Sequence, residues 1–277
     1  MITGRTLLIA HLGFPTESFK APMIYNPWFE RQGIDAVVVP MGVKAADYPA
    51  TLKALARLTN LRGALVTMPH KVATLALADE VTPTARIAGA CNALRKRPDG
   101  SWLGDQFDGA GFVRGVARKG RRLRGARAFV AGCGGVGSAI AASLAAAGVA
   151  ALDLCDIRAD AAAALRDRLL QHQPALPVRA GMNDPAGHDI VVNATPLGMQ
   201  EGDDLPFDVQ RVDAGALVGE VVMKAEHTPL LRAALARGLE VQVGTDMLFE
   251  MIPAYLEFFG FGTATADELR AVAQIRY

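Results

Sequence analysis

Short apolar runs alternate with helical stretches along the first 108 or so residues of the chain. Three of these runs are continuously apolar and are bounded by Gly, Pro or charged residues; they are residues 7–10, 36–39 and 64–66. Such runs are typical of strands buried on both faces of a parallel sheet. Leu52, Leu55 and Leu58 recur at helical spacing between the second and third runs, which predicts a crossover helix. Residues 97–100 (Arg-Pro-Asp-Gly) have turn chemistry between two short strand-like segments and predict a hairpin.

A second unit with the same alternation begins near Gly109. An apolar strand at 128–131 is followed by a glycine-rich turn and a long alanine-rich helix. Further strands are predicted at 151–155, 189–193, 216–222 and 240–243. From Asp246 onward the apolar residues recur at helical spacing; they are Met247, Leu248, Met251, Tyr255 and Phe258. The pattern predicts an α/β protein of two domains, an N-terminal α/β domain and a second domain with a doubly wound parallel sheet.

Length and composition agree with two domains and exclude several classes of protein. The chain has 277 residues, against about 150 for a typical domain, and 51% of its residues are hydrophobic. Its 29 basic and 28 acidic side chains leave a net charge of +1, which removes the electrostatic argument for a nucleic-acid binder. No apolar run approaches the ~20 residues of a membrane-spanning helix, and the first apolar stretch is too short for a secretory signal.

Cysteine and histidine usage gives no sign of metal or disulfide chemistry. The three cysteines are widely spaced, and the five histidines lack a paired metal spacing such as HExxH. We therefore expect no metal site and no disulfide framework, and the cysteine usage suits a reducing compartment. Together these observations predict a soluble, cytoplasmic protein that binds neither nucleic acid nor membrane.

The strongest single motif is the complete G-x-G-x-x-G of residues 132–137. Gly132 permits a tight turn out of the strand, Gly134 lets the backbone approach a pyrophosphate, and Gly137 lets the next helix pack closely. That helix points unpaired N–H groups and the positive end of its dipole at the phosphates. Because a strand precedes the motif, and a helix and a second strand follow it, the motif predicts a dinucleotide-binding site.

The identity of the dinucleotide depends on the end of that second strand. Asp156 lies 19 residues beyond Gly137 (156 − 137), where a carboxylate accepts hydrogen bonds from the adenosine ribose hydroxyls. A carboxylate there repels a 2′-phosphate and favours NAD over NADP. Arg158 is of a type that accommodates a 2′-phosphate, and Asp156 as an ordinary strand-end cap is the simpler alternative. The sequence favours NAD, with NADP as the second choice.

Several local strings occur in an order and spacing that resemble the shikimate/quinate dehydrogenase family. They are residues 67–71 (Thr-Met-Pro-His-Lys), 89–92 (Gly-Ala-Cys-Asn), 108–109 (Asp-Gly), 193–199 (Asn-Ala-Thr-Pro-Leu-Gly-Met) and 228–231 (Thr-Pro-Leu-Leu). The first of these strings, as V-T-x-P-x-K, and the fourth are the more specific. The resemblance runs from Gly13 to Tyr255.

The resemblance implies a two-domain oxidoreductase with a nicotinamide cofactor. A substrate and catalytic domain, residues 1–108 and 246–277, is interrupted by an NAD(P)-binding Rossmann domain, residues 109–245. The cofactor-binding residues implied by the glycine motif and the resemblance are Gly132, Gly134, Gly135, Val136, Gly137, Asp156, Arg158, Asn193, Thr195, Met223 and Gly244.

The resemblance also implies the residues that act on the substrate. Lys71 and Asp108 match the catalytic pair of the family, Asn92 matches the Asn beside them, and Thr67 matches a contact to a substrate hydroxyl. Hydride transfer between an alcohol and NAD(P) requires one proton to move, and a lysine beside a carboxylate can move it.

The chain departs from the family pattern where the family binds substrate. Phe19 and Ala21 replace a pair of hydroxyl residues that bind the substrate carboxylate, although Ser18 nearby could partly substitute for them. The other departures are Leu65 for Asn, Phe107 for Thr, Met223 for Tyr, Met251 for Gln, and Glu220 and Ala225 for an Asp and a Pro. Each buried polar group left unpaired costs ~1–3 kcal/mol. We therefore expect a pocket less polar than one for shikimate, with Ser18, Phe19, Ala21, Phe107 and Met251 among the residues that line it.

The leading hypothesis is a shikimate dehydrogenase-like enzyme. It transfers a hydride reversibly between NAD and a small alicyclic hydroxy acid or ketone. The alternatives are a true shikimate or quinate dehydrogenase of low efficiency and a non-catalytic NAD-binding sensor. Retention of the catalytic pair and of the glycine motif favours an enzyme whose substrate has changed. We expect a monomer or a homodimer.

Overall fold

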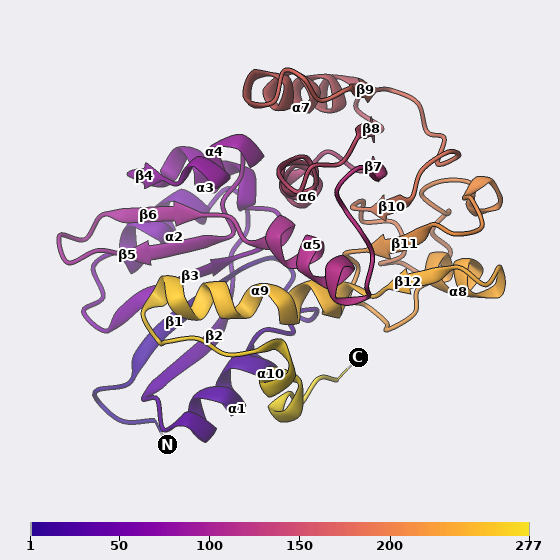
Figure 1. The fold of residues 1–277 in the computed structure, drawn as a ribbon. Coiled ribbons are helices and arrows are strands. Elements are labelled where there is room, and N and C mark those ends of the chain that lie inside the picture. Colours follow the sequence, from indigo (N-terminus) through magenta and orange to yellow (C-terminus); the bar gives the residue numbers. More distant parts are fainter. Residues whose placement is uncertain (1, 277) are drawn as a thin grey trace. The chain divides into compact units, whose positions relative to one another are not determined.

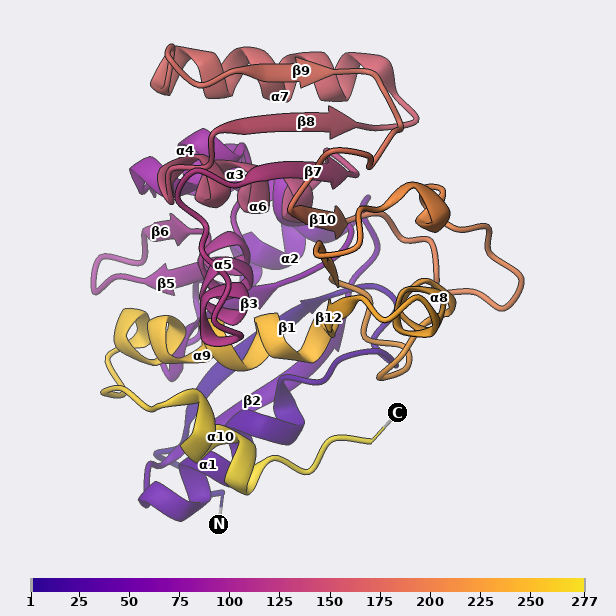
Figure 2. The same cartoon turned by 45° about the vertical axis from the view of Figure 1, so that its right-hand side comes forward.

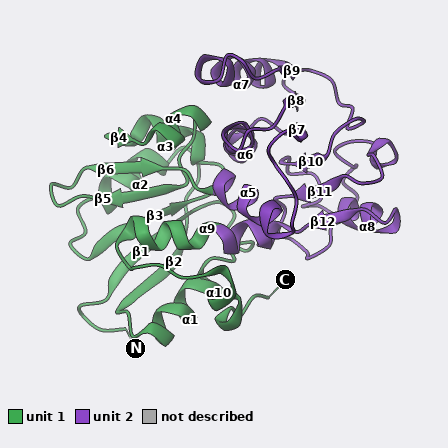
Figure 3. Ribbon diagram, viewed as in Figure 1, with its two compact units in different colours: residues 1–107, 251–276 green, residues 108–250, 277 purple. Residues whose placement is uncertain are grey.

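The computed structural model describes residues 2–276, which divide into two compact units (Figures 1 and 3). Unit 1 comprises the residues up to Phe107 and those from Met251 to Arg276, and unit 2 comprises Asp108–Glu250. Each unit contains one six-stranded sheet flanked by helices, so the predicted α/β class with two sheets is confirmed. Within the part of the chain that is described, no helix has the length and apolar character needed to cross a bilayer.

The sheet of unit 1 combines parallel and antiparallel strands in the order β2-β1-β3-β5-β6-β4. These strands are β1 (Leu7–Gly13), β2 (Ala36–Gly42), β3 (Leu61–Val66), β4 (Glu80–Val81), β5 (Ala93–Lys96) and β6 (Trp102–Asp105). β1 pairs in parallel with β2 and β3, as their continuous apolar runs predict. β5 and β6 form the predicted hairpin, whose turn is closed by a 2.9 Å hydrogen bond from Gly100 N to Arg97 O.

Helices connect these strands. They are α1 (Pro22–Gln32), α2 (Tyr48–Leu55), α3 (Lys71–Leu77), α4 (Pro83–Ala88), α10 (Ala266–Val272) and the part of α9 (Gly244–Phe259) from Met251 onward. The prediction that one helix includes Leu58 is wrong, because α2 ends at Leu55. The Leu58 side chain is 40% exposed, so no burial holds it on the apolar face of the helix.

The sheet of unit 2 is entirely parallel, in the order β12-β11-β10-β7-β8-β9. Its strands are β7 (Arg127–Ala131), β8 (Ala151–Cys155), β9 (Val178–Ala180), β10 (Ile190–Asn193), β11 (Leu217–Glu220) and β12 (Glu240–Gln242). The chain adds β8 and β9 on one side of β7 and then returns to place β10 on the other side. This reversal makes the β7–β10 boundary the topological switch point of a doubly wound sheet, as predicted.

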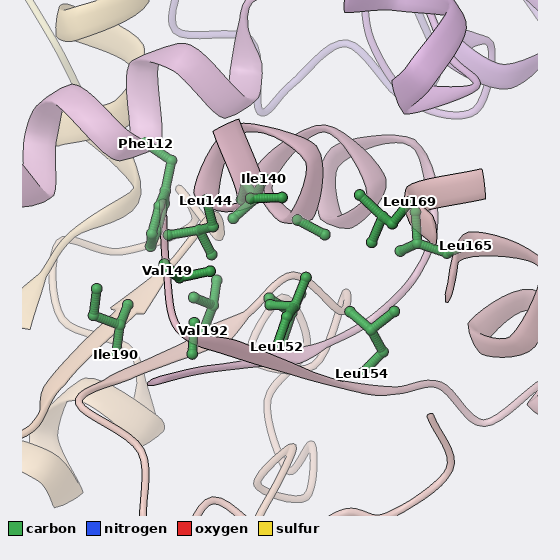
Figure 4. Packing of buried hydrophobic residues seen from close by; sticks show 14 of the residues in the cluster. Phe112, Ile140, Leu144, Val149, Leu152, Leu154, Leu165, Leu169, Ile190 and Val192 are labelled. Atoms are coloured by element: carbon green, nitrogen blue, oxygen red, sulfur yellow. The ribbon is translucent and has the colours of Figure 1, made fainter. Parts of the chain in front are cut away.

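Helices cover both faces of this sheet because alternate strand residues point to opposite faces. The helices are α5 (Asp108–Arg118), α6 (Gly135–Ala146), α7 (Ala159–His172), α8 (Pro229–Ala236) and the first part of α9; a short 3₁₀ turn spans Val209–Arg211. On one face, Leu152 and Val192 point toward Phe112, Ile140 and Leu144 of α5 and α6 (Figure 4). Along the sheet edge, α7 packs on β8 and β9 (Figure 2).

The opposite face of the sheet is equally apolar. Phe129, Val191 and Val218, each one residue out of step with the first face, pack against Leu230 and Leu231 of α8. Both faces are therefore buried, which explains why the central strands β7 and β10 read as nearly continuous apolar runs rather than alternating ones.

Candidate active site and cofactor loop

The loop from β3 to α3 carries Thr67 and Lys71, and a buried histidine fixes its shape. Thr67 N donates to Leu12 O on β1 at 2.9 Å, and His70 N donates to Thr67 O at 3.0 Å. The His70 ring is 1% exposed, stacks on Tyr48 at 4.0 Å and pairs through Nε2 with a backbone carbonyl, Val43 O, at 2.8 Å. His70 therefore has a structural role in the turn, and Lys71, half-buried, begins α3 directly after it.

Hydrogen bonds fix the backbone of Asn92 and the oxygen of its side-chain amide. Its carbonyl accepts from Val66 N at 2.7 Å and from the Tyr255 hydroxyl at 3.1 Å. Its Oδ1 accepts from Phe107 N at 3.0 Å, and the preceding Cys91 N donates to Lys71 O at 2.9 Å. Among the described residues no acceptor contacts the buried Asn92 Nδ2. The structure thus brings Asn92 and the start of α3 together and leaves one amide donor for a ligand.

Phe107 and Met251, which stand where the family has polar residues, lie in apolar surroundings. The half-buried Phe107 ring packs edge-on against Tyr255, with ring centroids 4.8 Å apart, and against Phe258 at 5.5 Å. Met251 in α9 is 8% exposed, and Leu65 in β3 is 4% exposed. These exchanges are accommodated by packing, so none of them leaves an unsatisfied polar group of its own.

Phe19 packs against His11, a residue for which no role in the site is predicted from the sequence. The Phe19 ring stacks on His11 of β1 with centroids 4.1 Å apart and planes 27° apart. A Cβ added at Gly13 would collide with both Thr67 and the Phe19 ring, so both side chains border the backbone of Gly13. Ala21 is buried at the start of α1, and Ser18 is half-buried in the turn before it. A lone polar residue inside an apolar strand, as in Ile-Ala-His-Leu, was the available signal for His11.

His11 is a neutral imidazole. It is 7% exposed, and its Nδ1 has no hydrogen-bond partner among the residues described. Burial, and after it the positive charge of Lys71, lowers the pKa of His11 to about 3. The influence of Lys71 places His11 within electrostatic reach of the predicted catalytic lysine.

Asp108 occupies the first position of α5 and belongs to unit 2, whereas Lys71 belongs to unit 1. The Asp108 side chain is 1% exposed. The next residue, Gly109, explains the Asp-Gly pair, because a Cβ there would collide with Ala139 O and with the Ser143 side chain of α6. Close packing of α5 on α6 therefore fixes the backbone that carries Asp108.

The glycine motif forms a tight loop between β7 and α6. Gly132 has φ +97°, and a Cβ there would collide with the backbone of Ala194 and Thr195, which follow β10. A Cβ at Gly137 would collide with Gly132 O, whereas a Cβ at Gly134 would meet nothing within 4 Å. The loop thus lies at the switch point. Its backbone packs tightly against the protein at Gly132 and Gly137, and it has free space beside it at Gly134. Gly135 and Val136 form the first turn of α6 beside it.

Asp156 is tied to this loop by its side chain. Its Oδ2 accepts from Cys133 N at 2.7 Å, and its Oδ1 accepts from Arg158 N at 2.9 Å. The Arg158 side chain is 67% exposed, and its Nε lies 3.9 Å from Asp156 Oδ1. Burial raises the pKa of the Cys133 thiol to about 12, so this thiol stays protonated at neutral pH.

Asn193 and Thr195 form a second turn at the switch point. Asn193 is fully buried, and its Oδ1 accepts from Thr195 N at 3.0 Å and from Thr195 Oγ1 at 2.7 Å. Its Nδ2 donates to Leu197 O at 3.1 Å and lies 3.5 Å from Glu220 Oε2. Glu220 is itself fully buried at the end of β11, and burial raises its pKa to about 7. The contact of Glu220 with Asn193 was not predicted from the sequence, where Glu220 stands only as an exchange for an Asp of the family pattern.

Met223 and Gly244 lie next to each other after β11 and β12. A Cβ added at Gly244 would collide with Val222 O and touch Met223 Cγ at 3.0 Å. Unit 2 therefore brings the predicted cofactor residues together at the carboxyl ends of its strands, with the exposed Arg158 side chain beside Asp156. No group of metal-ligating side chains occurs among residues 2–276.

Comparison with known proteins agrees with this arrangement. Residues 12–94 match the family described as the shikimate dehydrogenase substrate binding domain. Along its length the chain is similar to a shikimate dehydrogenase (NADP(+)) of Acidiphilium cryptum, with 37% identity over 99% of this chain and 98% of that protein. The chain belongs to the shikimate dehydrogenase family. The resemblance inferred from the local strings is confirmed, and with it the enzyme class, a dehydrogenase that acts on CH–OH groups.

Solved structures of shikimate dehydrogenase family proteins share the fold. One is quinate dehydrogenase from Corynebacterium glutamicum in complex with NAD, with 29% identity, a TM-score of 0.85, and coverage of 96% of this chain and 98% of that one. Another is shikimate 5-dehydrogenase from Thermus thermophilus in complex with NADP(H) and shikimate, with 26% identity, a TM-score of 0.86, and coverage of 97% and 99%. The roles of individual residues in this chain stay predictions.

Proposed function

We propose that the chain is an NAD(P)-dependent dehydrogenase that interconverts the hydroxyl and the ketone of a small alicyclic hydroxy acid or ketone less polar than shikimate. The observation that carries the proposal is the hydrogen bonding that ties residues 91–92 to Lys71, Val66 and Phe107, while apolar Leu65 and Phe107 stand where the family has polar residues. Hydrogen bonds hold the backbone around Lys71 and Asn92 in place. The side chains near them are apolar at positions where the family has polar ones. This combination favours retained chemistry on a changed substrate.

In this proposal unit 1 binds the substrate and unit 2 binds the nicotinamide cofactor. The residues of unit 2 fit such a group, because the loop is open at Gly134 and α6 begins directly behind it. The loop residues 132–137 would hold the pyrophosphate, Asp156 the adenosine ribose, and the segments at Thr195, Met223 and Gly244 the nicotinamide half. The bound cofactor supplies or accepts the hydride.

The chain's own residues then handle the proton. Lys71 and Asp108 take the proton of the substrate hydroxyl oxygen as the hydride leaves its carbon, and return it when the ketone is reduced. The Asn92 Nδ2 and the Thr67 hydroxyl hold the substrate oxygens in place. Burial of Asn92 keeps its amide in a fixed position within unit 1, which favours a defined orientation of the substrate.

Substitution of Lys71 tests the assignment. We expect Lys71→Ala to lower kcat by about 10²–10⁴, the usual contribution of a general acid–base residue, with an unchanged Kd for NADH. Lys53→Ala, an exposed lysine of α2, is the matched control and should leave both values unchanged. Full turnover by Lys71→Ala would exclude the proposed role. Saturable NADH binding without oxidoreduction of any alicyclic alcohol by the wild-type protein would instead establish the sensor alternative.

NAD is the cofactor that we propose for this chain, with NADP as the competing choice. The names of curated relatives such as that of Acidiphilium cryptum favour NADP, whereas the quinate dehydrogenase structure contains NAD. Asp156 supports NAD, because a fixed carboxylate repels a 2′-phosphate and accepts from ribose hydroxyls. Steady-state kinetics with both cofactors decide the matter: we expect kcat/KM to be higher with NAD, and a preference for NADP would refute this assignment.

A second candidate is a true shikimate or quinate dehydrogenase. The full-length similarity to shikimate dehydrogenases favours it. Assays with both acids would separate the two proposals. A kcat/KM near the diffusional limit on shikimate or quinate would contradict the argument for a changed substrate, and weak turnover of both acids would support it.

A further inference from the structure

A neutral imidazole and a phenyl ring form one wall beside Thr67 in unit 1. His11 and Phe19 are stacked at 4.1 Å, and the Phe19 ring and the Thr67 side chain both border Gly13. His11 pairs in register with Leu65 of the neighbouring strand, so their side chains point to the same face of the sheet. The wall formed by His11, Phe19 and Leu65 therefore offers one polar ring among apolar groups.

The polar atoms of His11 have no protein partner to satisfy them. No hydrogen bond to His11 occurs among the described residues, and its Nδ1 is sealed from solvent. A neutral imidazole carries its proton on one nitrogen only, and the sealed Nδ1 favours the tautomer protonated at Nε2. His11 can then donate one hydrogen bond through Nε2, a capacity that packing alone does not require.

The absence of a positive charge on the His11 ring determines which substrate groups this wall can bind. A buried carboxylate needs several donors or a cation, and leaving it without them is far more costly than leaving a hydroxyl partly satisfied. The imidazole is neutral across the physiological range, because burial and Lys71 hold its pKa at about 3. Ala21 and Leu65 contribute no donor from their side chains, and Lys71 and Thr67 are assigned to other substrate oxygens in the proposed function. A single neutral donor matches a hydroxyl or carbonyl oxygen, not a carboxylate.

We propose that His11, stacked on Phe19, is a specificity-determining residue that receives an uncharged hydroxyl or carbonyl group of the substrate. The substrate is then a polyhydroxy alcohol or ketone without a carboxylate at this wall. This inference rests on the proposed dehydrogenase function and narrows its substrate class. His11 positions the substrate and does not move the proton.

A matched pair of substrates tests the inference in the wild-type protein. The pair is shikimate and its hydroxymethyl analogue, in which a CH₂OH group replaces the carboxylate. We expect kcat/KM to be at least about tenfold higher for the hydroxymethyl analogue, since one unmatched buried charge exceeds one hydrogen bond in free energy.

Substitution of His11 tests the same point from the protein side. His11→Phe keeps a ring to stack on Phe19 and removes the nitrogens. We expect it to lower kcat/KM for the hydroxymethyl analogue about tenfold, mainly through KM, with an unchanged Kd for NADH. His172→Phe, at an exposed position of α7, is the control and should change neither value. Phe19→Ser is expected to shift the preference toward shikimate.

The outcomes separate this inference from the function on which it rests. Turnover that depends on Lys71 but prefers shikimate, or that is unaffected by His11→Phe, overturns the assignment of His11 and leaves the dehydrogenase function intact. Absence of Lys71-dependent turnover on either member of the pair, and on a wider panel of alicyclic alcohols, overturns the function and the inference together. If His11→Phe does not fold, the wild-type preference between the two substrates decides.

Discussion

The carboxylate of Asp156, at the end of β8, accepts a 2.7 Å hydrogen bond from Cys133 N in the phosphate loop. The same carboxylate accepts from Arg158 N through its other oxygen. Asp156 shapes the loop through these hydrogen bonds, and substitution can separate this role from the proposed action of its charge on the ribose end of the cofactor. The two alternatives that the sequence left open, a ribose ligand and a strand-end cap, are compatible in one residue.

Asp156→Asn removes the charge and keeps one acceptor oxygen. We expect the ratio of kcat/KM for NADP to that for NAD to rise about tenfold, because the repulsion of a 2′-phosphate is lost. Steady-state kinetics with both cofactors measure this ratio. Asp156→Ala removes both acceptors and should weaken the binding of both cofactors. An unchanged ratio in Asp156→Asn would show that the carboxylate does not face the ribose.

Gly134 and Gly137 are expected to respond differently to the same change. Gly137→Ala places a Cβ against Gly132 O, so the loop or the helix must shift and the free energy of unfolding should fall by about 1–3 kcal/mol. Gly134→Ala places its Cβ in open space, so stability should be unchanged. The new methyl would stand where the pyrophosphate approaches the backbone, and the Kd for NADH should rise at least tenfold.

Urea unfolding and NADH titration of both glycine variants check this contrast. Equal losses of stability in the two variants would contradict the geometry of the loop. Unchanged NADH binding in Gly134→Ala would place the pyrophosphate elsewhere.

The regular parts of this fold were accessible from the sequence because they depend on local pattern. Both parallel regions gave continuous apolar runs, and the glycine motif has its strand and helix as predicted. The two- and three-residue strands β4 and β9 were missed, since so few residues carry no periodicity. The region from Asp246 onward is helical as predicted, but its division into α9 and α10 was not predicted, although the capping box that begins α10, Thr265 with Glu268, is legible in the sequence.

The missed site residues depend on contacts between distant parts of the chain. His11 acquires its neutral state from burial and from Lys71, which lies 60 positions further along (71 − 11). Glu220 meets Asn193 only because β10 and β11 are neighbours in register. No local sequence pattern predicts such contacts. The short strings shared with the family do include residues near them, such as Lys71 and Asn193.

Asp153 and His188 form a buried pair within the sheet of unit 2. His188 Nε2 lies 3.0 Å from Asp153 Oδ2, and two nitrogens of Arg179 donate to the same carboxylate at 2.9 and 2.6 Å. Asp153→Asn should lower the free energy of unfolding by about 3 kcal/mol, because His188 is 3% exposed and loses its charged partner. Arg179→Ala, which removes a 66% exposed side chain, should have a small effect and serves as the comparison.

The same pair predicts a loss of stability in acid. Burial raises the pKa of Asp153, but the hydrogen bonds and charges of Arg179 and His188 outweigh it and hold the pKa below its usual value. A carboxyl whose pKa is lower in the folded protein stabilises the fold at any pH above its pKa in the unfolded chain, about 4. This stabilisation is lost as the pH falls below that value and through the lower pKa of the folded protein. Unfolding between pH 5 and pH 3 should show a shallower loss in Asp153→Asn than in the wild type.

Glu220 should make the protein less stable as the pH rises through neutrality. Its carboxyl is fully buried, Oε1 has no partner among the described residues, and burial raises its pKa to about 7 although Thr228 and Asn193 hydrogen-bond it. Below about pH 4.5 the group is protonated in both states. Between pH 4.5 and 7 the unfolded chain releases the proton and the folded protein keeps it, so stability falls as the pH rises.

Glu220→Gln keeps the shape and remains neutral at every pH. We expect the loss of unfolding free energy between pH 5 and pH 8 to be smaller than in the wild type by about 2–3 kcal/mol. Because Asn193 holds the turn that abuts Gly132, the affinity for NADH should also become less dependent on pH over this range. Glu201→Gln, an exposed position in the same unit, is the control and should match the wild type. A wild-type pH dependence retained in Glu220→Gln would assign the effect to another group.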